Sequence, residues 1–76
     1  VEIYLKGGVI MNMIPVSSSR MNAVGWENNL MYVQFKNGVV YAYEGVSKAE
    51  FDNFMSSSSL GSALSILDKK HNYYRV

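Results

Sequence analysis

The stretch Leu30-Met-Tyr-Val-Gln-Phe-Lys36, followed by Asn37-Gly38 and then by Val39-Val-Tyr-Ala-Tyr-Glu44, decides the fold. Both flanks are rich in β-branched and aromatic residues, which favour strands. Asn-Gly supplies the positive φ angles that a two-residue type I′ turn requires. The segment therefore predicts an antiparallel β-hairpin.

The turn also predicts which side chains share a face of this hairpin. A two-residue turn places Lys36 opposite Val39, and the other pairs follow by counting outward. One face then carries apolar side chains that we expect to be buried: Met31, Val33 opposite Ala42, and Phe35 opposite Val40. The other face carries Gln34 opposite Tyr41 and Tyr32 opposite Tyr43. We expect that second face to be a platform of tyrosines.

The segments before the hairpin predict further strands. Residues 20–26 read as a strand that follows a break at Pro15 and Ser17–Ser19, and residues 27–29 turn the chain into the hairpin. Val1, Ile3 and Leu5 alternate with polar or amphipathic residues, which is typical of an N-terminal strand. The alternative is that the natural start lies at Met11 or Met13. We therefore expect a strand or extension over residues 1–15, before the domain proper.

The segments after the hairpin predict helices and a last strand. Ser47 and Glu50 form a capping box at the start of a helix whose apolar stripe is Phe51, Phe54 and Met55. A second helix follows residues 56–59, with Ala63, Leu64 and Leu67 at helical spacing and with Lys69 and Lys70 in its last turn. Residues 72–76 then close the sheet as an edge strand. The sequence predicts an α+β fold, a small antiparallel sheet with one or two short helices inserted before the final strand.

Length and composition limit what this fold can hold. The length of 76 residues allows no more than one domain, and a domain of this size buries only about 60% of the surface that its unfolded chain exposes. Yet 49% of the residues are hydrophobic and only 17% are charged, so we expect a homo-oligomer that buries the surplus apolar surface. There is no cysteine and only one histidine, His71. We therefore expect no disulfide, no metal and no cofactor.

The net charge of +1 bears on the partners. Duplex DNA calls for a strongly basic footprint, so this partner is not expected. No apolar run reaches the length of about eighteen residues that spans a membrane, and residues 1–10 are too acidic and too interrupted by glycine for a signal peptide. Together with the missing cysteines, this predicts a protein of the bacterial or phage-infected cytoplasm.

The order of these pieces resembles the KTSC domain family, a short domain appended to some lysyl-tRNA synthetases and found alone in bacteria and phages. The resemblance covers residues 16–76 and is carried by Val16, Ser18-Ser19, Val24-Gly25-Trp26, Met31-x-Val33-x-Phe35-x-Asn37-Gly38, Tyr41-x-Tyr43, Val46, Phe51, Ser59-x-Gly61 and Tyr74-Arg75-Val76. It implies a nucleic-acid-binding role. Ser62 and Ala63 depart from the family, where a basic residue and often an aromatic follow the glycine. Both changes weaken the interpretation as an electrostatic RNA binder.

Two polar groups predict a phosphate site. Ser18, Ser19 and Arg20 combine a hydroxyl-rich turn with a guanidinium, which suits a phosphate. Ser59, Gly61 and Ser62 open the second helix, where backbone N–H groups attract anions. We expect the two groups to meet in one pocket. The alternative is that the serines only cap the helix or form a turn.

Aromatic residues and a last arginine complete the predicted site. Tyr41 and Tyr43 should line the mouth of the pocket and stack on bases, at about 1–3 kcal/mol per base. Alternatively a helix or a second subunit covers this face and the rings belong to the core. Arg75 is expected to reach a phosphate or a base, or else to be an ordinary surface arginine.

No catalytic constellation is expected. His71 is interpreted as a solvated loop residue, the six carboxylates show no paired spacing, and no Walker A motif or dinucleotide fingerprint occurs. The leading hypothesis is a non-catalytic module that binds nucleotides or RNA. The alternatives are an oligomeric phage-type protein that sequesters a cyclic nucleotide immune signal, and a protein–protein adaptor. The near-neutral charge favours a small ligand over a long polyanion.

Overall fold

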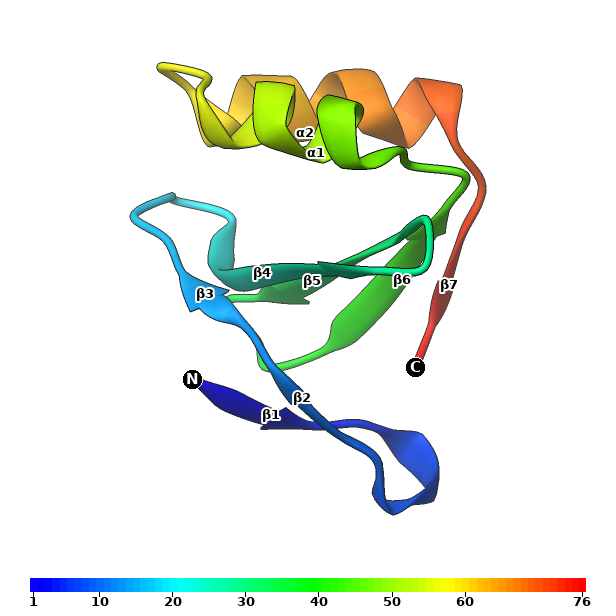
Figure 1. The fold of residues 1–76 in the computed structure, drawn as a ribbon. Helices are drawn as coiled ribbons and strands as arrows, with labels where there is room; N and C mark the ends of the chain where they lie inside the picture. The colour runs from blue at the N-terminus through cyan, green and yellow to red at the C-terminus, as the bar shows by residue number, and fades with distance from the viewer.

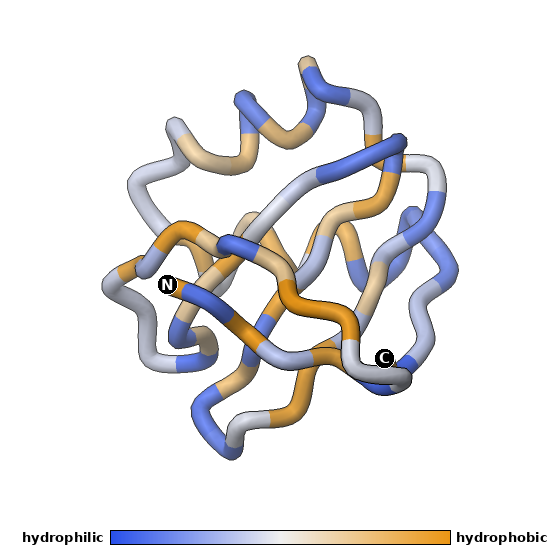
Figure 2. The backbone as a smooth tube through the Cα atoms, turned by 60° about the horizontal axis from the view of Figure 1, so that its bottom comes forward, coloured by the Kyte–Doolittle hydropathy of each residue, from blue (hydrophilic) through white to orange (hydrophobic).

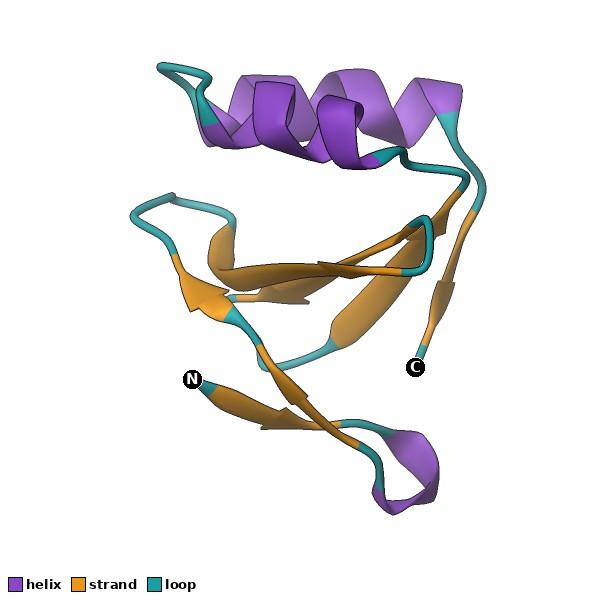
Figure 3. Cartoon of the chain, in the orientation of Figure 1, coloured by secondary structure: helices purple, strands orange, loops and turns teal.

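The computed structural model describes residues 1–76 as three layers (Figure 1). The middle layer is a five-stranded antiparallel sheet in the order β3-β4-β5-β6-β7, with β3 at Ile14–Pro15, β4 at Met21–Glu27, β5 at Leu30–Phe35, β6 at Val40–Glu44 and β7 at Tyr73–Arg75. Helices α1 (Lys48–Met55) and α2 (Leu60–Lys70) cover one face of this sheet (Figure 3). Beneath the other face lies a hairpin of β1 (Glu2–Tyr4) and β2 (Ile10–Asn12), joined through a 3-10 helix at Lys6–Gly8. The predicted α+β class is confirmed, with two helices before the final strand.

The β5–β6 hairpin forms, but the predicted register is wrong by one residue. Met31 pairs with Tyr43, and Val33 pairs with Tyr41. The loop has three residues, because the Phe35 N–H donates to the Val39 carbonyl at 2.9 Å. This is the geometry of a type I turn followed by a bulge, in place of a type I′ turn.

Local contacts explain why the loop is longer than predicted. Within this three-residue loop, Gly38 alone has a positive φ, of 89°, and Asn37 does not enter the left-handed region. The Asn37 side-chain carbonyl accepts a hydrogen bond from the Val39 N–H at 3.1 Å, which is how Asn stabilises a turn from its own side chain. The Gly38 N–H closes the turn by donating to the Phe35 carbonyl at 2.9 Å.

The change of register moves every β6 side chain to the other face of the sheet. Tyr41 and Tyr43 therefore lie on the helix side with Val33, and Tyr43 is only 1% exposed. Val40 and Tyr32 face the N-terminal hairpin instead. The predicted division into an apolar face and a tyrosine platform is thus wrong, and the helix layer covers Tyr43.

The two-residue type I′ turn occurs one hairpin earlier. Glu27 pairs with Leu30, and both residues between them have positive φ, 52° at Asn28 and 62° at Asn29. Asn tolerates this left-handed conformation better than other side chains do. The predicted turn at residues 27–29 is therefore confirmed.

Both helices begin at serine caps. Ser47 accepts a hydrogen bond from the Glu50 N–H at 3.1 Å, and Ser59 accepts one from the Ser62 N–H at 3.4 Å. The apolar sides of the helices then pack onto the sheet through Phe51, Phe54, Leu64 and Leu67. The Ser47 cap and the apolar stripes agree with the sequence prediction. The predicted capping box is incomplete, because the Glu50 carboxylate contacts His71 and Lys70 instead of the Ser47 N–H. The Ser59 cap corresponds to the alternative given for these serines.

A second, smaller core lies between the sheet and the N-terminal hairpin: Ile3, Met13, Ala23 and Val40. Hydrophobic and hydrophilic positions alternate along β1, as Figure 2 shows, and Ile3 is the buried one. A Cβ atom at Gly25 would lie 3.0 Å from Met11 Cε and 3.2 Å from Met13 Cγ. The glycine therefore lets these methionines approach the sheet. Neither helix has the length or the apolar run needed to cross a membrane.

Candidate functional site

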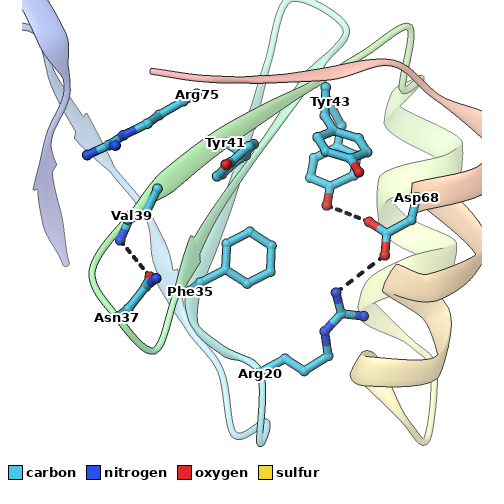
Figure 4. A pocket seen from close by; sticks show the side chains of 9 residues that line it. Arg20, Phe35, Asn37, Val39, Tyr41, Tyr43, Asp68 and Arg75 are labelled. Atoms are coloured by element: carbon cyan, nitrogen blue, oxygen red, sulfur yellow. Dashed lines mark hydrogen bonds and ion pairs between the residues drawn. The ribbon is translucent and has the colours of Figure 1, made fainter.

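A cavity of about 390 Å³ opens beside strand β7 (Figure 4). Its lining comes from the residue before β4, from the β5–β6 hairpin, from α2 and from β7: Arg20, Phe35, Asn37, Val39, Tyr41, Tyr43, Asp68, Tyr73 and Arg75. Four of the residues predicted from the sequence line this cavity: Arg20, Tyr41, Tyr43 and Arg75. They lie as much as 55 positions apart in the chain, so the fold brings them together.

One wall of the cavity is built around Asp68 on α2. The Tyr43 hydroxyl donates to Asp68 Oδ1 at 2.7 Å, and Arg20 donates to Asp68 Oδ2 at 3.3 Å. Burial, and then the hydrogen bond to Asp68, raise the pKa of Tyr43 well above its usual value of 10.0. Tyr43 therefore stays protonated and serves as a fixed donor, and both oxygens of Asp68 are engaged.

The Arg20 guanidinium is also committed to contacts within the chain. Arg20 Nη1 donates to the Gly61 carbonyl at 3.3 Å and to the Ser65 hydroxyl at 3.2 Å, whereas Nη2 makes the contact with Asp68. The guanidinium carbon, Arg20 Cζ, lies 5.9 Å from the centre of the Phe35 ring. Arg20 thus ties the first and last turns of α2 to the sheet, while its side chain remains 38% exposed.

Aromatic rings form the floor of the cavity. Tyr41 stands edge-on to Phe35 and to Tyr73, with ring centres 5.8 Å apart in each case. The rings of Tyr73 and Tyr43 lie 4.9 Å apart in a tilted arrangement. Tyr73 is 48% exposed, so this ring is accessible from solvent.

Arg75 lies on β7 directly opposite Tyr41. Figure 4 shows its guanidinium at the other side of the cavity from Arg20. Arg75 is exposed and makes no ion pair or hydrogen bond through its side chain. Of the two arginines in the lining, Arg75 is therefore the one whose five donors are all available to a ligand.

The predicted serines lie close to this wall but do not line the cavity. Ser18 accepts a hydrogen bond from the Arg20 backbone N–H at 3.1 Å, which makes it part of a turn. Ser59 and Ser62 hydrogen-bond to each other at the start of α2, and Ser19 is exposed. The two predicted groups do meet, because Arg20 donates to the Gly61 carbonyl. The serine hydroxyls, however, serve the turn at Ser18 and the helix cap at Ser59.

The sequence prediction missed five lining residues: Phe35, Asn37, Val39, Asp68 and Tyr73. One of them carried a usable signal. Asp68 lies in the last turn of a helix, where a carboxylate opposes the helix dipole. An acidic residue at such a position needs compensating donors, and Tyr43 and Arg20 supply them.

A second cluster of charges lies away from the cavity, where α2 ends against α1. Glu50 Oε2 lies 2.8 Å from His71 Nε2 and 3.1 Å from Lys70 Nζ. Burial alone would raise the pKa of Glu50, but the hydrogen bonds from His71 and Lys70 outweigh burial and lower it. The prediction of a solvated His71 is wrong, because its side chain is only 10% exposed.

Comparisons with known proteins agree on one family. The profile described as the KTSC domain matches residues 17–73. The crystal structure of a KTSC domain protein from Yersinia pestis superposes with a TM-score of 0.80 at 31% sequence identity, covering 86% of this chain and 96% of that one. No curated protein sequence matches significantly.

Proposed function

The chain belongs to the KTSC domain family, and we propose that it is a non-catalytic module that binds a small nucleotide in the cavity beside β7. The observation that carries the proposal is the pairing of an unengaged guanidinium with an accessible aromatic ring in one cavity, Arg75 with Tyr73. A guanidinium is a bidentate donor that suits a phosphate, and an aromatic ring is a flat apolar surface on which a base can stack.

The size and the charge of the site favour a small ligand over a long RNA. About 390 Å³ lies within the range of ligand pockets, which runs from about 300 to 1,000 Å³. A nucleic-acid strand needs a track of cations, whereas the lining contains two arginines, one of them already paired with Asp68.

We assign each lining residue a role in this proposal. Arg75 contacts the phosphate, and Tyr41 and Tyr73 stack on the base. Arg20 and Asp68 hold the wall and reach the ligand only at its edge. Because Tyr43 and Arg20 occupy both oxygens of Asp68, this carboxylate is not free to act as a general base, which favours binding over catalysis.

Isothermal titration with AMP, ADP, cyclic dinucleotides and adenosine tests the proposal. We expect phosphate-bearing ligands to bind and adenosine to bind at least tenfold more weakly. Arg75→Ala should weaken the phosphate-bearing ligands by about tenfold, or about 1.4 kcal/mol, and leave the Tm unchanged because Arg75 has no partner in the chain. Lys36→Ala is the matched control, since it removes an exposed positive charge that does not line the cavity.

Two results would contradict the proposal. The first is the absence of any binding or of any rise in Tm, since a ligand of the folded state must raise it. The second is an equal loss of affinity in Arg75→Ala and Lys36→Ala, which would indicate unspecific attraction. Tight binding of short RNA with a steep salt dependence would favour the RNA-binding alternative.

A second candidate function, that of a protein adaptor, is favoured by one observation. The N-terminal hairpin and β3 expose large apolar side chains: Tyr4, Val9, Ile10 and Ile14 are 48% to 73% exposed. Patches of this kind are common at protein interfaces. If the adaptor is the function, Tyr4→Ser with Ile10→Ser should abolish partner binding in a pull-down while nucleotides leave the Tm of the wild-type protein unchanged.

A further inference from the structure

Strand β7 forms one edge of the main sheet and has no strand on its outer side. On its inner side, the Val76 N–H donates to the Val40 carbonyl, and the Asn72 carbonyl accepts from the Glu44 N–H. Backbone groups alternate in direction along a strand, so residues 72, 74 and 76 face β6. Tyr73 and Arg75 therefore direct their N–H and C=O groups outward, where the chain supplies no partner.

This edge has some of the features that normally prevent pairing and lacks others. Exposed edges are usually blunted by short length, a charged side chain, a proline, a bulge, an inward charge or a covering segment. β7 is only three residues long and carries Arg75. β7 has no proline, its pairing with β6 is regular, and two of its three side chains are large exposed aromatics, Tyr73 at 48% and Tyr74 at 44%. The edge is thus open to another strand.

We propose that two copies of the chain pair antiparallel through β7, about a twofold axis at Tyr74, and so join their cavities into one site for a ligand with two phosphate groups. In this register Tyr73 of one copy stands opposite Arg75 of the other. The outward backbone groups of these two residues then form the hydrogen-bonded pairs, and no inward group has to change partner.

The side chains of this strand are self-complementary in that register. Arg75 meets the ring of Tyr73 from the second copy, which is a favourable cation–π pair. On the opposite face of the sheet the two Tyr74 rings come together across the axis, and aromatic cross-strand pairs stabilise a sheet. A second copy is therefore an occupant whose chemistry matches the edge.

The same register explains why the ligand should carry two phosphates. Tyr73 and Arg75 both line the cavity, so pairing places the two cavities side by side across the axis. The two Arg75 residues become diagonal neighbours, about 7–8 Å apart in Cα position, and their like charges repel. A ligand with two phosphates relieves this repulsion and stabilises the dimer. This linkage rests on the proposed function, whereas the edge pairing does not.

Sedimentation velocity of the full chain over a range of concentrations, with and without cyclic di-AMP, measures the linkage. We expect a saturating concentration of this ligand to tighten dimerisation at least tenfold, and adenosine to have no effect. Amide hydrogen exchange should show new protection at Tyr73 and Arg75 in the dimer, and none at Glu2 and Tyr4 on the edge of β1.

A matched pair of variants at Arg75 separates the contribution of its backbone N–H to dimerisation from the contribution of its side chain. Arg75→Ala removes the two cation–π pairs but keeps the outward backbone N–H, so it should weaken ligand-free dimerisation moderately and lose all enhancement by the ligand. Arg75→Pro also removes the outward N–H and should weaken dimerisation at least tenfold beyond Arg75→Ala. Tyr4→Pro blocks the edge of β1 and should leave dimerisation unchanged. Circular dichroism checks that each variant is folded, and hydrogen exchange on the wild type decides the matter if the proline variant is not.

Three outcomes separate this inference from the proposed function. Nucleotide binding by a protein that stays monomeric up to millimolar concentration overturns the pairing and leaves the proposed function standing. If Tyr4→Pro abolishes dimerisation and Arg75→Pro does not, the interface lies at β1, and this result also overturns the inference. Protection of Tyr73 and Arg75 in a dimer that binds no nucleotide supports the edge pairing but refutes both the ligand linkage and the proposed function.

Discussion

The wall built by Tyr43, Asp68 and Arg20 can be tested by deleting one hydroxyl. Tyr43→Phe keeps the ring, which is 1% exposed, and removes only the donor that lies 2.7 Å from Asp68 Oδ1. A hydrogen bond to a charged group contributes about 1.5–3 kcal/mol. Because the Asp68 side chain is 28% exposed and keeps Arg20, water partly replaces the lost donor, and the lower end applies. We expect a loss of about 1.5 kcal/mol, or a fall in Tm of roughly 6–12 °C for a domain of this size.

Urea unfolding followed by circular dichroism measures this change, with Tyr41→Phe as the matched control. The Tyr41 hydroxyl has no hydrogen-bond partner in the chain, and the residue is half-buried on the same strand and the same face. Tyr41→Phe should therefore change the free energy of unfolding by less than about 0.5 kcal/mol. The urea m value should stay the same in both variants, which shows that the surface exposed on unfolding is unchanged.

The pH dependence gives a second, independent readout of the same hydroxyl. An unfolded tyrosine loses its proton near pH 10, whereas burial and the bond to Asp68 raise the pKa of folded Tyr43. Above pH 10 the folded state therefore binds more protons than the unfolded state, so the free energy of unfolding falls as the pH rises. Tyr43→Phe removes this component and should flatten the curve. Equal stability losses in Tyr43→Phe and Tyr41→Phe, together with parallel pH curves, would refute the role assigned to Tyr43.

Three further predictions concern stability. Val33→Asp should unfold the domain, because Val33 is fully buried and an unpaired buried charge costs several kcal/mol; a folded variant with an unchanged Tm would contradict the packing of β5. Ser59→Ala should lower the free energy of unfolding by about 1 kcal/mol through loss of the α2 cap and leave nucleotide affinity unchanged in titrations. The lowered pKa of Glu50 contributes stability above the unfolded pKa near 4.5 that is lost as the pH falls through the folded value. The difference in Tm between the wild type and Glu50→Gln should thus shrink from pH 6 to pH 3, and a constant difference would contradict the cluster with His71.

The predictable part of the fold is the part that local rules determine. Ser47 and Ser59 each cap the helix that follows, and these contacts span three residues, so their spacing in the sequence is sufficient. Strands β1, β4, β5, β6 and β7 followed from alternating, β-branched and aromatic residues, which need no knowledge of the partner strand. Strands β2 and β3 were not predicted, and Pro15, which was expected to belong to a break, lies in β3 opposite Ala23. The edge position of β7 followed from its being last and short. Each of these features is decided by residues within one turn or one strand.

The register of the central hairpin was decided by contacts that the sequence does not display. Asn37-Gly38 permits both a two-residue and a three-residue loop, because glycine accepts a positive φ in each. The shorter loop would turn Tyr43 away from α2. The longer loop places its hydroxyl on Asp68, 25 positions along the chain, and buries its ring. A tertiary hydrogen bond and a buried aromatic outweigh the local preference of the dipeptide.

The roles within the site show the same limit. Arg20 and Arg75 were both identified from the sequence as phosphate contacts, and nothing in their neighbours along the chain distinguishes them. The fold distinguishes them, since Arg20 faces Asp68, Gly61 and Ser65, whereas Arg75 faces solvent across the cavity. Arg20→Ala is therefore a poor test of binding, because it also frees α2 from the sheet. Arg75 is the residue at which a loss of affinity can be measured without a loss of stability, and any claim that this cavity binds phosphate depends on it.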